Sequence, residues 1–154
     1  MAKLTKFELT ELPELLVVGK RITDYNEPMD VLKKLWDRCA DDGVFQTLEE
    51  QDGYVYDSSM VGFRYGDTDA EYIVGLLMRP GALVPEGFSS FLIGPVKTAI
   101  CWVKGKGLFD VISNASKLMG KALEKRVFER EKTEIRPGGW NSMTRNGFFR
   151  MRRK

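Results

Sequence analysis

The sequence predicts an α+β fold of duplicated β-α-β-β units, which form one antiparallel sheet with two helices on one face and a groove between the halves. Three observations favour this fold. Two segments have the apolar spacing of amphipathic helices, and about eight short runs have the composition or alternation of strands. These elements do not alternate as a doubly wound parallel sheet requires. Short phrases also recur at a nearly constant distance along the chain.

The recurring phrases indicate an internal duplication, which determines the architecture wherever it is present. They lie 82, 80 and 83 residues apart, and they are Pro13 and Pro95, Asp30-Val31-Leu32 and Asp110-Val111-Ile112, and Val44-Phe45 and Val127-Phe128. We therefore expect a single domain, 1–154, with pseudo-repeat halves 1–75 and 76–148 and a basic C-terminal tail, 145–154. The alternative is that two amphipathic helices flanked by strands resemble each other by chance.

The first half begins with a short strand at 7–9 and a more apolar strand at 12–18. Pro28 suits the first position of the helix that follows, because its missing N–H is not needed there. Asp42-Gly43 ends this helix, whose apolar face comprises Val31, Leu32, Leu35, Trp36 and Cys39. The polar segment 46–52 is expected to be a loop. Strands at 54–56 and 60–65, joined by a turn at 57–59, and a central strand at 72–78 complete this half.

The second half is expected to repeat this order with strands at 88–93 and 99–103, which Gly94-Pro95 separates. A basic loop at 104–107 precedes a helix, and Val127-Phe128 begin a further strand. The apolar face of the helix comprises Val111, Ile112, Ala115, Met119, Ala122 and Leu123. The pattern then weakens, and residues 148–154 predict at most a short basic final strand.

The composition is typical of a folded cytoplasmic protein. Hydrophobic residues make up 43% of the 154 residues and charged residues 30%, and the most apolar windows are too short to span a bilayer. The first residues carry lysines and lack the apolar core of a secretion signal, so we do not expect secretion. With the short apolar windows, we also expect no membrane partner. Cys39 and Cys101 lie in apolar patterns and are expected to be buried free thiols, unless the fold brings them together.

The chain contains no histidine. This excludes Ser–His and Cys–His nucleophile systems and most zinc sites, so any chemistry would depend on carboxylates, tyrosines, lysines or arginines. The segment Gly105-Lys106-Gly107 lacks the third glycine and the helix-opening hydroxyl residue of a phosphate-binding loop. We therefore expect no metal and no cofactor, and a binding protein is favoured over an enzyme.

The net charge of +2 is distributed unevenly. Residues 135–154 hold six cations and no acid, which leaves 18 cations against 22 acids in residues 1–134. Such a tail either makes weak, salt-sensitive contacts with nucleic acid phosphates or keeps the chain soluble. The sequence has no helix-turn-helix pattern, so sequence-specific DNA binding is not expected.

Aromatic residues in the middle of the chain form the candidate binding site. Alternation places Tyr54 and Tyr56 on one face of a strand, and Phe63 and Tyr65 on one face of the next. Aromatic walls beside a carboxylate suit a flat organic cation, because the ring faces attract positive charge and the carboxylate balances it. Packing in the core explains each ring taken alone.

Four phrases within residues 6–134 carry a family resemblance, namely FELTELPELLVVGKRI, EYIVGLLM, VPEGFSSFLIGPVKTAICWVKGKG and FDVISNASKLMGKALEKRVF. Together they resemble the GyrI-like family, also called the bacterial transcription-activator effector-binding family. The resemblance implies a groove between two halves that receives amphipathic, often cationic, small molecules. It also implies a lining of aromatic rings and an acid late in the second half. Glu134 corresponds to this acid, and Arg136 replaces the tyrosine that usually follows it.

We therefore expect a stand-alone GyrI-like domain that binds an amphipathic cationic small molecule without a DNA-binding module of its own. Its role would be transcriptional regulation or drug sequestration (multidrug binding). The residues expected to line the site are Trp36, Tyr54, Tyr56, Phe63, Tyr65 and Trp102, with Glu134 as the counter-charge. Two alternatives stay open: a hydrolase of reactive small molecules that uses Glu134 as base, and an interaction protein that modulates gyrase or a regulator.

Overall fold

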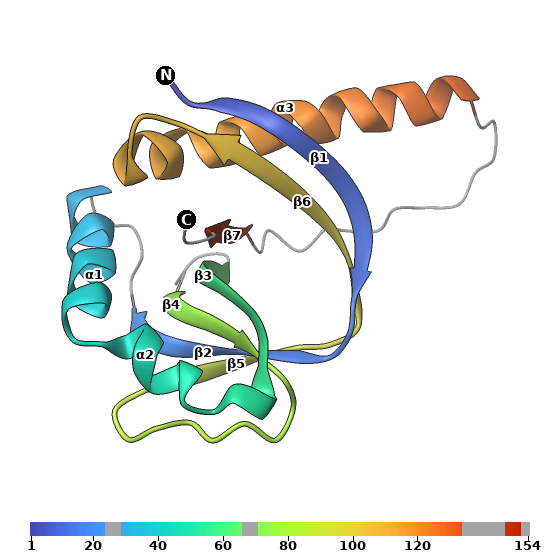
Figure 1. The fold of residues 1–154 in the computed structure, drawn as a ribbon. Helices are drawn as coiled ribbons and strands as arrows, with labels where there is room; N and C mark the ends of the chain where they lie inside the picture. Colours follow the sequence, from blue (N-terminus) through green and yellow to red (C-terminus); the bar gives the residue numbers. More distant parts are fainter. Residues whose placement is uncertain (24–28, 66–70, 134–146, 152–154) are drawn as a thin grey trace. The chain divides into compact units, whose positions relative to one another are not determined.

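The computed structural model describes residues 1–23, 29–65, 71–133 and 147–151 (Figure 1). The chain divides into two compact units. We call Met1–Thr10 with Lys97–Thr144 the β1–β6 unit, and Glu11–Val96 with Arg145–Lys154 the five-stranded unit. No helix within the described residues is long and apolar enough to cross a membrane.

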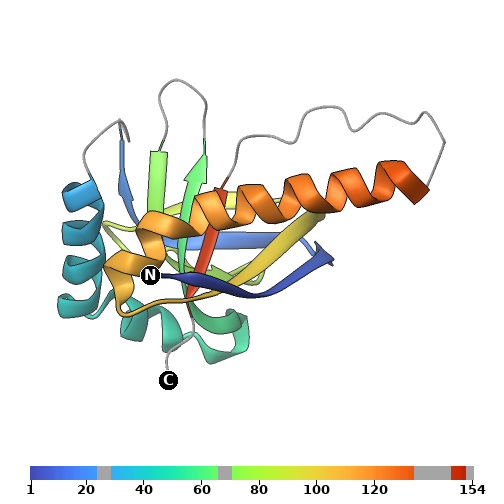
Figure 2. The same cartoon turned by 90° about the horizontal axis from the view of Figure 1, so that it is seen from above.

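The five-stranded unit contains an antiparallel sheet with the strand order β5-β2-β4-β3-β7 (Figure 2). Its strands are β2 (Leu15–Ile22), β3 (Val55–Tyr65), β4 (Glu71–Met78), β5 (Ser89–Ile93) and β7 (Gly147–Met151). β4 lies in the middle, and every residue of β4 after Glu71 is buried, as a nearly continuous apolar run requires. The central strand expected at 72–78 is therefore confirmed.

Helices α1 (Met29–Asp41) and α2 (Val44–Glu49) pack against this sheet. They bury their apolar residues, namely Leu32, Leu35, Trp36 and Cys39 in α1 and Val44, Phe45 and Leu48 in α2. The exposed residues of α1 include Lys33, Lys34, Asp37 and Arg38. The amphipathic pattern of the sequence thus predicted correctly which side of α1 faces the protein interior.

The two faces of the sheet differ in what lies on them. Trp36 lies over Gly62, because a Cβ atom at Gly62 would be 2.8 Å from the Trp36 ring. Successive residues of a strand point to opposite faces, so Gly62 belongs to the helix face and Phe63 to the other. We call the second face the aromatic face. Its buried cluster comprises Leu12, Leu15, Val17, Val61, Phe63, Ile73 and Leu77, with Tyr56, Phe91 and Ile93 packed against them.

Segment 46–52 is not the expected loop, because helix α2 and a short 3₁₀ helix at Asp52–Tyr54 occupy most of it. Val44, Phe45 and Leu48 fall on one helical face and are buried, which outweighs the polar residues around them. Gly43 separates α2 from α1 with a left-handed φ of 67°, a conformation that glycine adopts without steric cost.

The expected turn at 57–59 is wrong as well, because a single strand, β3, runs through it. The pairing of β3 with β4 shifts register between Val55 and Met60, as at a β-bulge. Within this irregularity the Asp57 carboxylate accepts a hydrogen bond from the Ser59 backbone N–H at 2.8 Å. The segment Asp57-Ser58-Ser59, whose residues are typical of a turn, is therefore accommodated within a strand.

The β1–β6 unit contains a two-stranded sheet of β1 (Lys3–Leu12) and β6 (Val96–Lys104), followed by the long helix α3 (Leu108–Thr133). The Thr5 hydroxyl donates a hydrogen bond to the Trp102 carbonyl oxygen at 2.9 Å and so ties β1 to β6. α3 continues through Val127-Phe128, so these residues do not begin a strand.

The α+β class and the antiparallel pairing are confirmed, but the expectation of a single sheet is wrong. The described strands form a five-stranded and a two-stranded sheet. The breaks between them fall at Pro13 and at Gly94-Pro95, since a proline supplies no N–H to the ladder. The final strand is confirmed as β7. The duplicated β-α-β-β unit and the halves 1–75 and 76–148 stay predictions.

Candidate functional site

Two phenylalanines meet on the aromatic face although their strands are not neighbours. Phe63 of β3 and Phe91 of β5 have ring centroids 5.2 Å apart with an interplanar angle of 41°, whereas β2 and β4 lie between their strands in the sheet. Offset or tilted contacts of this kind are favourable arrangements of aromatic rings. The contact therefore closes a ring-lined patch over the middle strands.

A pair of glycines explains why no side chain stands between these rings. Gly19 of β2 and Gly75 of β4 are direct partners in the ladder. A Cβ atom at Gly19 would lie 1.9 Å from the Val74 carbonyl oxygen, and one at Gly75 would lie 1.8 Å from the Val18 carbonyl oxygen. Only glycine is compatible with so close an approach of two backbones. The two glycines thus leave room for the rings of Phe63 and Phe91 to meet over β2 and β4.

One end of the aromatic face carries opposite charges. Arg21 follows Gly19 by two positions and Glu71 precedes Ile73 by two, so both belong to the aromatic face by alternation. The Arg21 guanidinium lies 3.4 Å from the Glu71 carboxylate, and their side chains are 44% and 27% exposed. An ion pair with this exposure contributes only about 0–1 kcal/mol. Glu71 is therefore open to competition by another cation.

The chain's own cations already lie over several rings. The Arg79 guanidinium is 5.5 Å from the centre of the Tyr56 ring, and the Lys20 ammonium is 4.4 Å from that of Phe88. In the β1–β6 unit the Lys6 ammonium is 4.2 Å from the centre of a Trp102 ring. Cations are drawn to aromatic faces by the ring quadrupole. An internal cation therefore already lies over the rings of Tyr56 and Trp102, and their role in ligand binding stays a prediction.

The structure brings together only part of the site predicted from the sequence. Tyr56 and Phe63 both contact the buried cluster of the aromatic face. Trp36 lies on the helix face, where its indole N–H donates to the Tyr72 hydroxyl at 3.4 Å and its ring lies 6.4 Å from that of Phe45. Because the sheet itself separates Trp36 from Phe63, these two residues do not line one wall.

The remaining predicted residues are dispersed. Tyr54 is 44% exposed in the 3₁₀ helix, and Tyr65 is the ladder partner of Glu71 at the end of β3. Trp102 belongs to the β1–β6 unit. Glu134, the predicted counter-charge, lies outside the described residues. Its role stays a prediction.

The sequence reasoning missed Phe91 and Glu71. Glu71 begins the run EYIVGLLM and shares the alternation of Ile73 and Leu77. That alternation was the available signal. The contact of Phe91 with Phe63 had no signal in the sequence, because it depends on the order in which distant strands pair.

The two cysteines are free in the structure. Cys39 is buried, and burial raises the pKa of its thiol to about 11. Cys101 is half-buried rather than buried, and burial also raises the pKa of its thiol. Both thiols are protonated at neutral pH and make weak nucleophiles. Within the described part of the chain, no group of three His, Cys, Asp or Glu residues is placed to hold a metal ion.

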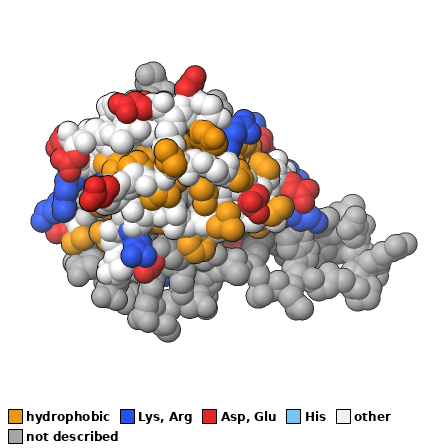
Figure 3. Space-filling model, turned by 90° about the horizontal axis from the view of Figure 1, so that it is seen from below, with side chains coloured by type: hydrophobic (Ala, Val, Ile, Leu, Met, Phe, Trp, Pro, Cys, Tyr) orange, Lys and Arg blue, Asp and Glu red, His pale blue; other side chains and the backbone are white. Residues whose placement is uncertain are grey.

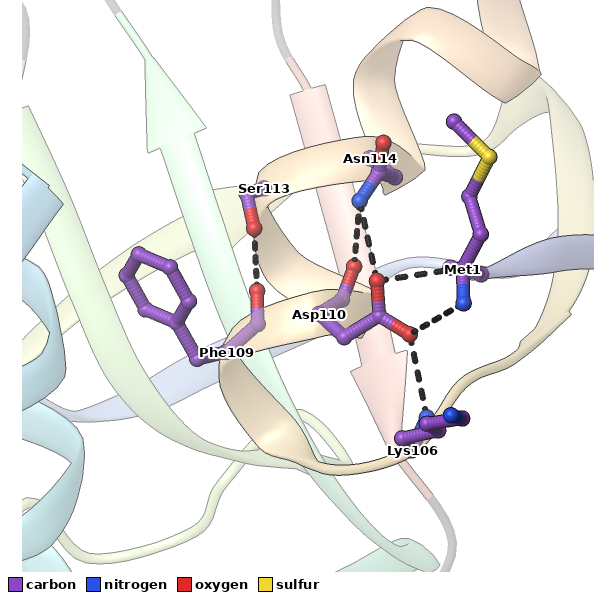
Figure 4. A network of polar contacts seen from close by, with 7 residues as sticks. Met1, Lys106, Phe109, Asp110, Ser113 and Asn114 are labelled. Carbon is purple, nitrogen blue, oxygen red and sulfur yellow. Dashed lines mark hydrogen bonds and ion pairs between the residues drawn. The ribbon is translucent and has the colours of Figure 1, made fainter.

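Asp110 is the centre of a polar network at the start of α3 (Figure 4). Its carboxylate accepts hydrogen bonds from the backbone N–H of Lys106 at 3.0 Å and of Ala2 at 3.1 Å, and from the Asn114 side-chain amide at 3.2 Å. The Met1 ammonium lies 3.7 Å away. These contacts, with the Lys106 hydrogen bond first, lower the pKa of Asp110 below its ordinary value. The carboxylate is occupied by its own chain and links the start of α3 to Lys106 and to Ala2.

Comparison with known proteins gives no family. No family model and no curated protein matches the chain. Among solved structures, SAV2435 bound to tetraphenylphosphonium is similar with a TM-score of 0.48 and 16% identity, over 60% of this chain and 58% of that one. The chain thus spans less than two thirds of SAV2435. An integron cassette protein from the mobile metagenome of Vibrio cholerae is similar with a TM-score of 0.48 and 15% identity, over 77% of this chain and 79% of that one. Membership of the GyrI-like family stays a prediction.

Proposed function

We propose that this protein binds a hydrophobic organic cation on the aromatic face of the five-stranded unit, with Glu71 as the counter-charge. The observation that carries the proposal is the contact of Phe63 with Phe91 on the face that ends in Glu71. Rings and a carboxylate on one surface are the combination that a flat or bulky aromatic cation requires.

Phe91 is the ring that a ligand would contact first. It is half-buried and belongs to β5 at the edge of the sheet, whereas Phe63 is only 5% exposed. A ligand ring that packs on Phe91 removes apolar surface from water on both partners. The cationic centre of the ligand then lies toward Glu71.

Arg21 competes with the ligand for Glu71 in this arrangement. The two substitutions Glu71→Gln and Arg21→Gln should therefore have opposite effects on affinity for a cation. Removal of the carboxylate weakens binding, while removal of the guanidinium leaves Glu71 without this competitor and strengthens binding. A ligand that merely adhered to exposed apolar surface would show neither effect.

The experiment is a titration of the protein with ethidium, followed by fluorescence anisotropy, at low and at physiological salt. We expect Glu71→Gln to raise the dissociation constant about fivefold and Arg21→Gln to lower it. Glu50→Gln, which neutralises an exposed acid after α2, is the matched control and should bind like the parent. Equal affinity of the parent and Glu71→Gln would refute the assignment of Glu71, and no binding at millimolar dye would refute the function.

The two other functions stay predictions. The hydrolase hypothesis depends on Glu134, which lies outside the described residues. Modulation of gyrase or of a regulator has no observation in the structure that favours it. A tail that contacts nucleic acid likewise has no support beyond its charge.

A further inference from the structure

β5 is an unusual edge strand. It stands at the end of the order β5-β2-β4-β3-β7, so it has a described strand neighbour on one side only. Its sequence, SSFLI, has neither a charged residue nor a proline, and its pairing with β2 runs through five residue pairs without a register shift. Each other described strand contains at least one charged residue. Soluble proteins normally protect an edge strand with charge, proline or a bulge, and β5 has none of these devices.

Apolar side chains accompany this edge. Leu92 of β5 is 56% exposed, and Leu83 and Val84 in the preceding segment are 74% and 42% exposed. Figure 3 views the molecule from below relative to Figure 1, which is the side on which β5 and residues 79–88 lie. Hydrophobic side chains gather over the middle of this face. An exposed apolar patch beside an unprotected strand edge is a surface suited to association.

We infer that β5 pairs with β5 of a second copy of this chain, in antiparallel orientation, and so joins two five-stranded sheets into one. An open strand edge accepts an extended backbone, which makes a β-strand the fitting partner. A two-fold axis normal to the sheet generates an antiparallel neighbour with the same face outward, as closed symmetric dimers require. The inference is argued from the strand edge and not from the proposed ligand, although Phe91 belongs to both.

The two-fold axis also determines the register. Residues on the same face must stand opposite each other, so the two residue numbers of each pair must have an even sum. The register that pairs all five residues of β5 places Phe91 opposite Phe91 of the second copy and Leu92 opposite Ser90. Aromatic cross-strand pairs of this kind are stabilising. Leu92 and its symmetry mate then lie diagonally across the new ladder, within reach of long side chains.

The charges around β5 fit the same partner. Glu86 is exposed shortly before β5, and Lys97 is exposed shortly after it. The Lys20 ammonium also lies at the first of these ends, 2.8 Å from the Gly87 carbonyl oxygen. Because paired copies of β5 run in opposite directions, the end with Glu86 and Lys20 meets the end with Lys97. A second copy therefore offers Glu86 a further cation as well as a backbone edge, which an uncharged or uniformly acidic peptide does not.

Sedimentation velocity from about 1 to about 200 µM tests the inference. A short edge interface is at the small end of protein contacts, so we expect a reversible dimer with a dissociation constant on the order of 10 µM. Leu92→Lys places two like charges diagonally across the pair and should raise that constant at least about tenfold. Leu9→Lys removes a leucine of similar exposure, 50%, from β1 in the other unit and should leave the dimer intact.

Mixing two oppositely charged variants of Leu92 distinguishes loss of pairing from loss of folding. Leu92→Glu alone should be monomeric for the same reason as Leu92→Lys, whereas the two variants together should form a heterodimer because their charges are then opposite. A monomeric parent protein at the highest concentration would overturn the inference. A dimer that survives Leu92→Lys, or that Leu9→Lys disrupts equally, would overturn the assignment to β5.

Discussion

Gly62 occupies a position where a side chain would collide with two buried aromatic residues. A Cβ atom there would lie 1.9 Å from the Tyr72 hydroxyl oxygen and 2.8 Å from the ring of Trp36 in α1, and both side chains are buried. The glycine therefore sets how closely the helix packs on the sheet. At this site the size of one residue determines the position of an element.

We predict that Gly62→Ala lowers the free energy of unfolding by about 1–3 kcal/mol, because the buried rings have to shift. Urea denaturation measures the change. Gly53→Ala is the matched control, since no atom lies within 4 Å of a Cβ there, and it should stay within about 0.5 kcal/mol of the parent. Adding Tyr72→Phe to Gly62→Ala should restore part of the loss, because it removes the nearest atom. Equal effects of the two glycine substitutions would contradict this explanation.

A second prediction at the scale of residues concerns Asp110 and the dependence of stability on pH. Its pKa is lowered in the folded protein, first by the Lys106 hydrogen bond, so the ionised carboxylate stabilises the folded state above its unfolded pKa. This stabilisation is lost as the pH falls through the folded pKa. Asp110→Asn should therefore lower the melting temperature at pH 7, and the difference from the parent should shrink below about pH 4.

The amide introduced by Asp110→Asn keeps an acceptor oxygen in place of the carboxylate, so the difference from the parent reports the charge. Thermal unfolding between neutral and acid pH measures it. A melting-temperature difference that stays constant over this range would show that the carboxylate charge is not the cause. Cys39 and Cys101 do not complicate the range, because burial raises the pKa of both thiols.

At the scale of elements, the segment between β4 and β5 is held by side chains from outside it. The Gln51 side-chain amide donates to the Leu83 carbonyl oxygen at 2.9 Å and accepts from the Leu83 N–H at 2.8 Å. The Lys20 ammonium donates to the Gly87 carbonyl oxygen at 2.8 Å. Both backbone groups of Leu83 are thus satisfied while its side chain is exposed, so the segment presents Leu83 without belonging to a helix or strand.

We predict that Gln51→Ala loosens this segment, because the Leu83 N–H and carbonyl each lose a partner. The local opening free energy should fall by about 1–2 kcal/mol, which hydrogen–deuterium exchange of peptides covering 79–88 reports. Gln46→Ala on the exposed side of α2 is the control and should leave that exchange unchanged. Unchanged exchange in Gln51→Ala as well would mean that other contacts hold the segment.

At the scale of the whole molecule, the basic end of the chain is part of the fold. β7 pairs with β3 from Met60 to Arg64 and covers what would otherwise be a second edge of the five-stranded sheet. The chain thus enters the five-stranded unit twice, through Glu11–Val96 and again through Arg145–Lys154. Residues Lys97–Thr144, which belong to the β1–β6 unit, separate these two segments.

We predict that deletion of residues 145–154 lowers the melting temperature by at least about 5 °C, because β3 loses its ladder on one side. A variant with Arg152→Gln and Arg153→Gln keeps β7 and removes charge, so it should melt like the parent. Calorimetry of the three proteins decides between a structural and a purely electrostatic role of this segment. An unchanged melting temperature after the deletion would show that β7 contributes nothing to stability.

The sequence alone determined the features that depend on spacing along one element. The buried side of α1, the central strand at 72–78 and the α+β class follow from the periods of helices and strands, which are local properties of the chain. Two predictions from local composition were wrong. The polar segment 46–52 is largely helical because the apolar residues of α2 are buried, and the turn expected at 57–59 lies within strand β3.

Only the tertiary structure decided which of these faces share a surface. Trp36 and Phe63 are separated by the sheet, Phe91 meets Phe63 over Gly19 and Gly75, and Glu71 ends the same face as Phe63. These relations depend on the order β5-β2-β4-β3-β7, in which strands distant along the chain become neighbours. Period along a chain shows which side chains share a face of a strand but not which strands are neighbours, because strands with the same alternation can pair in several orders.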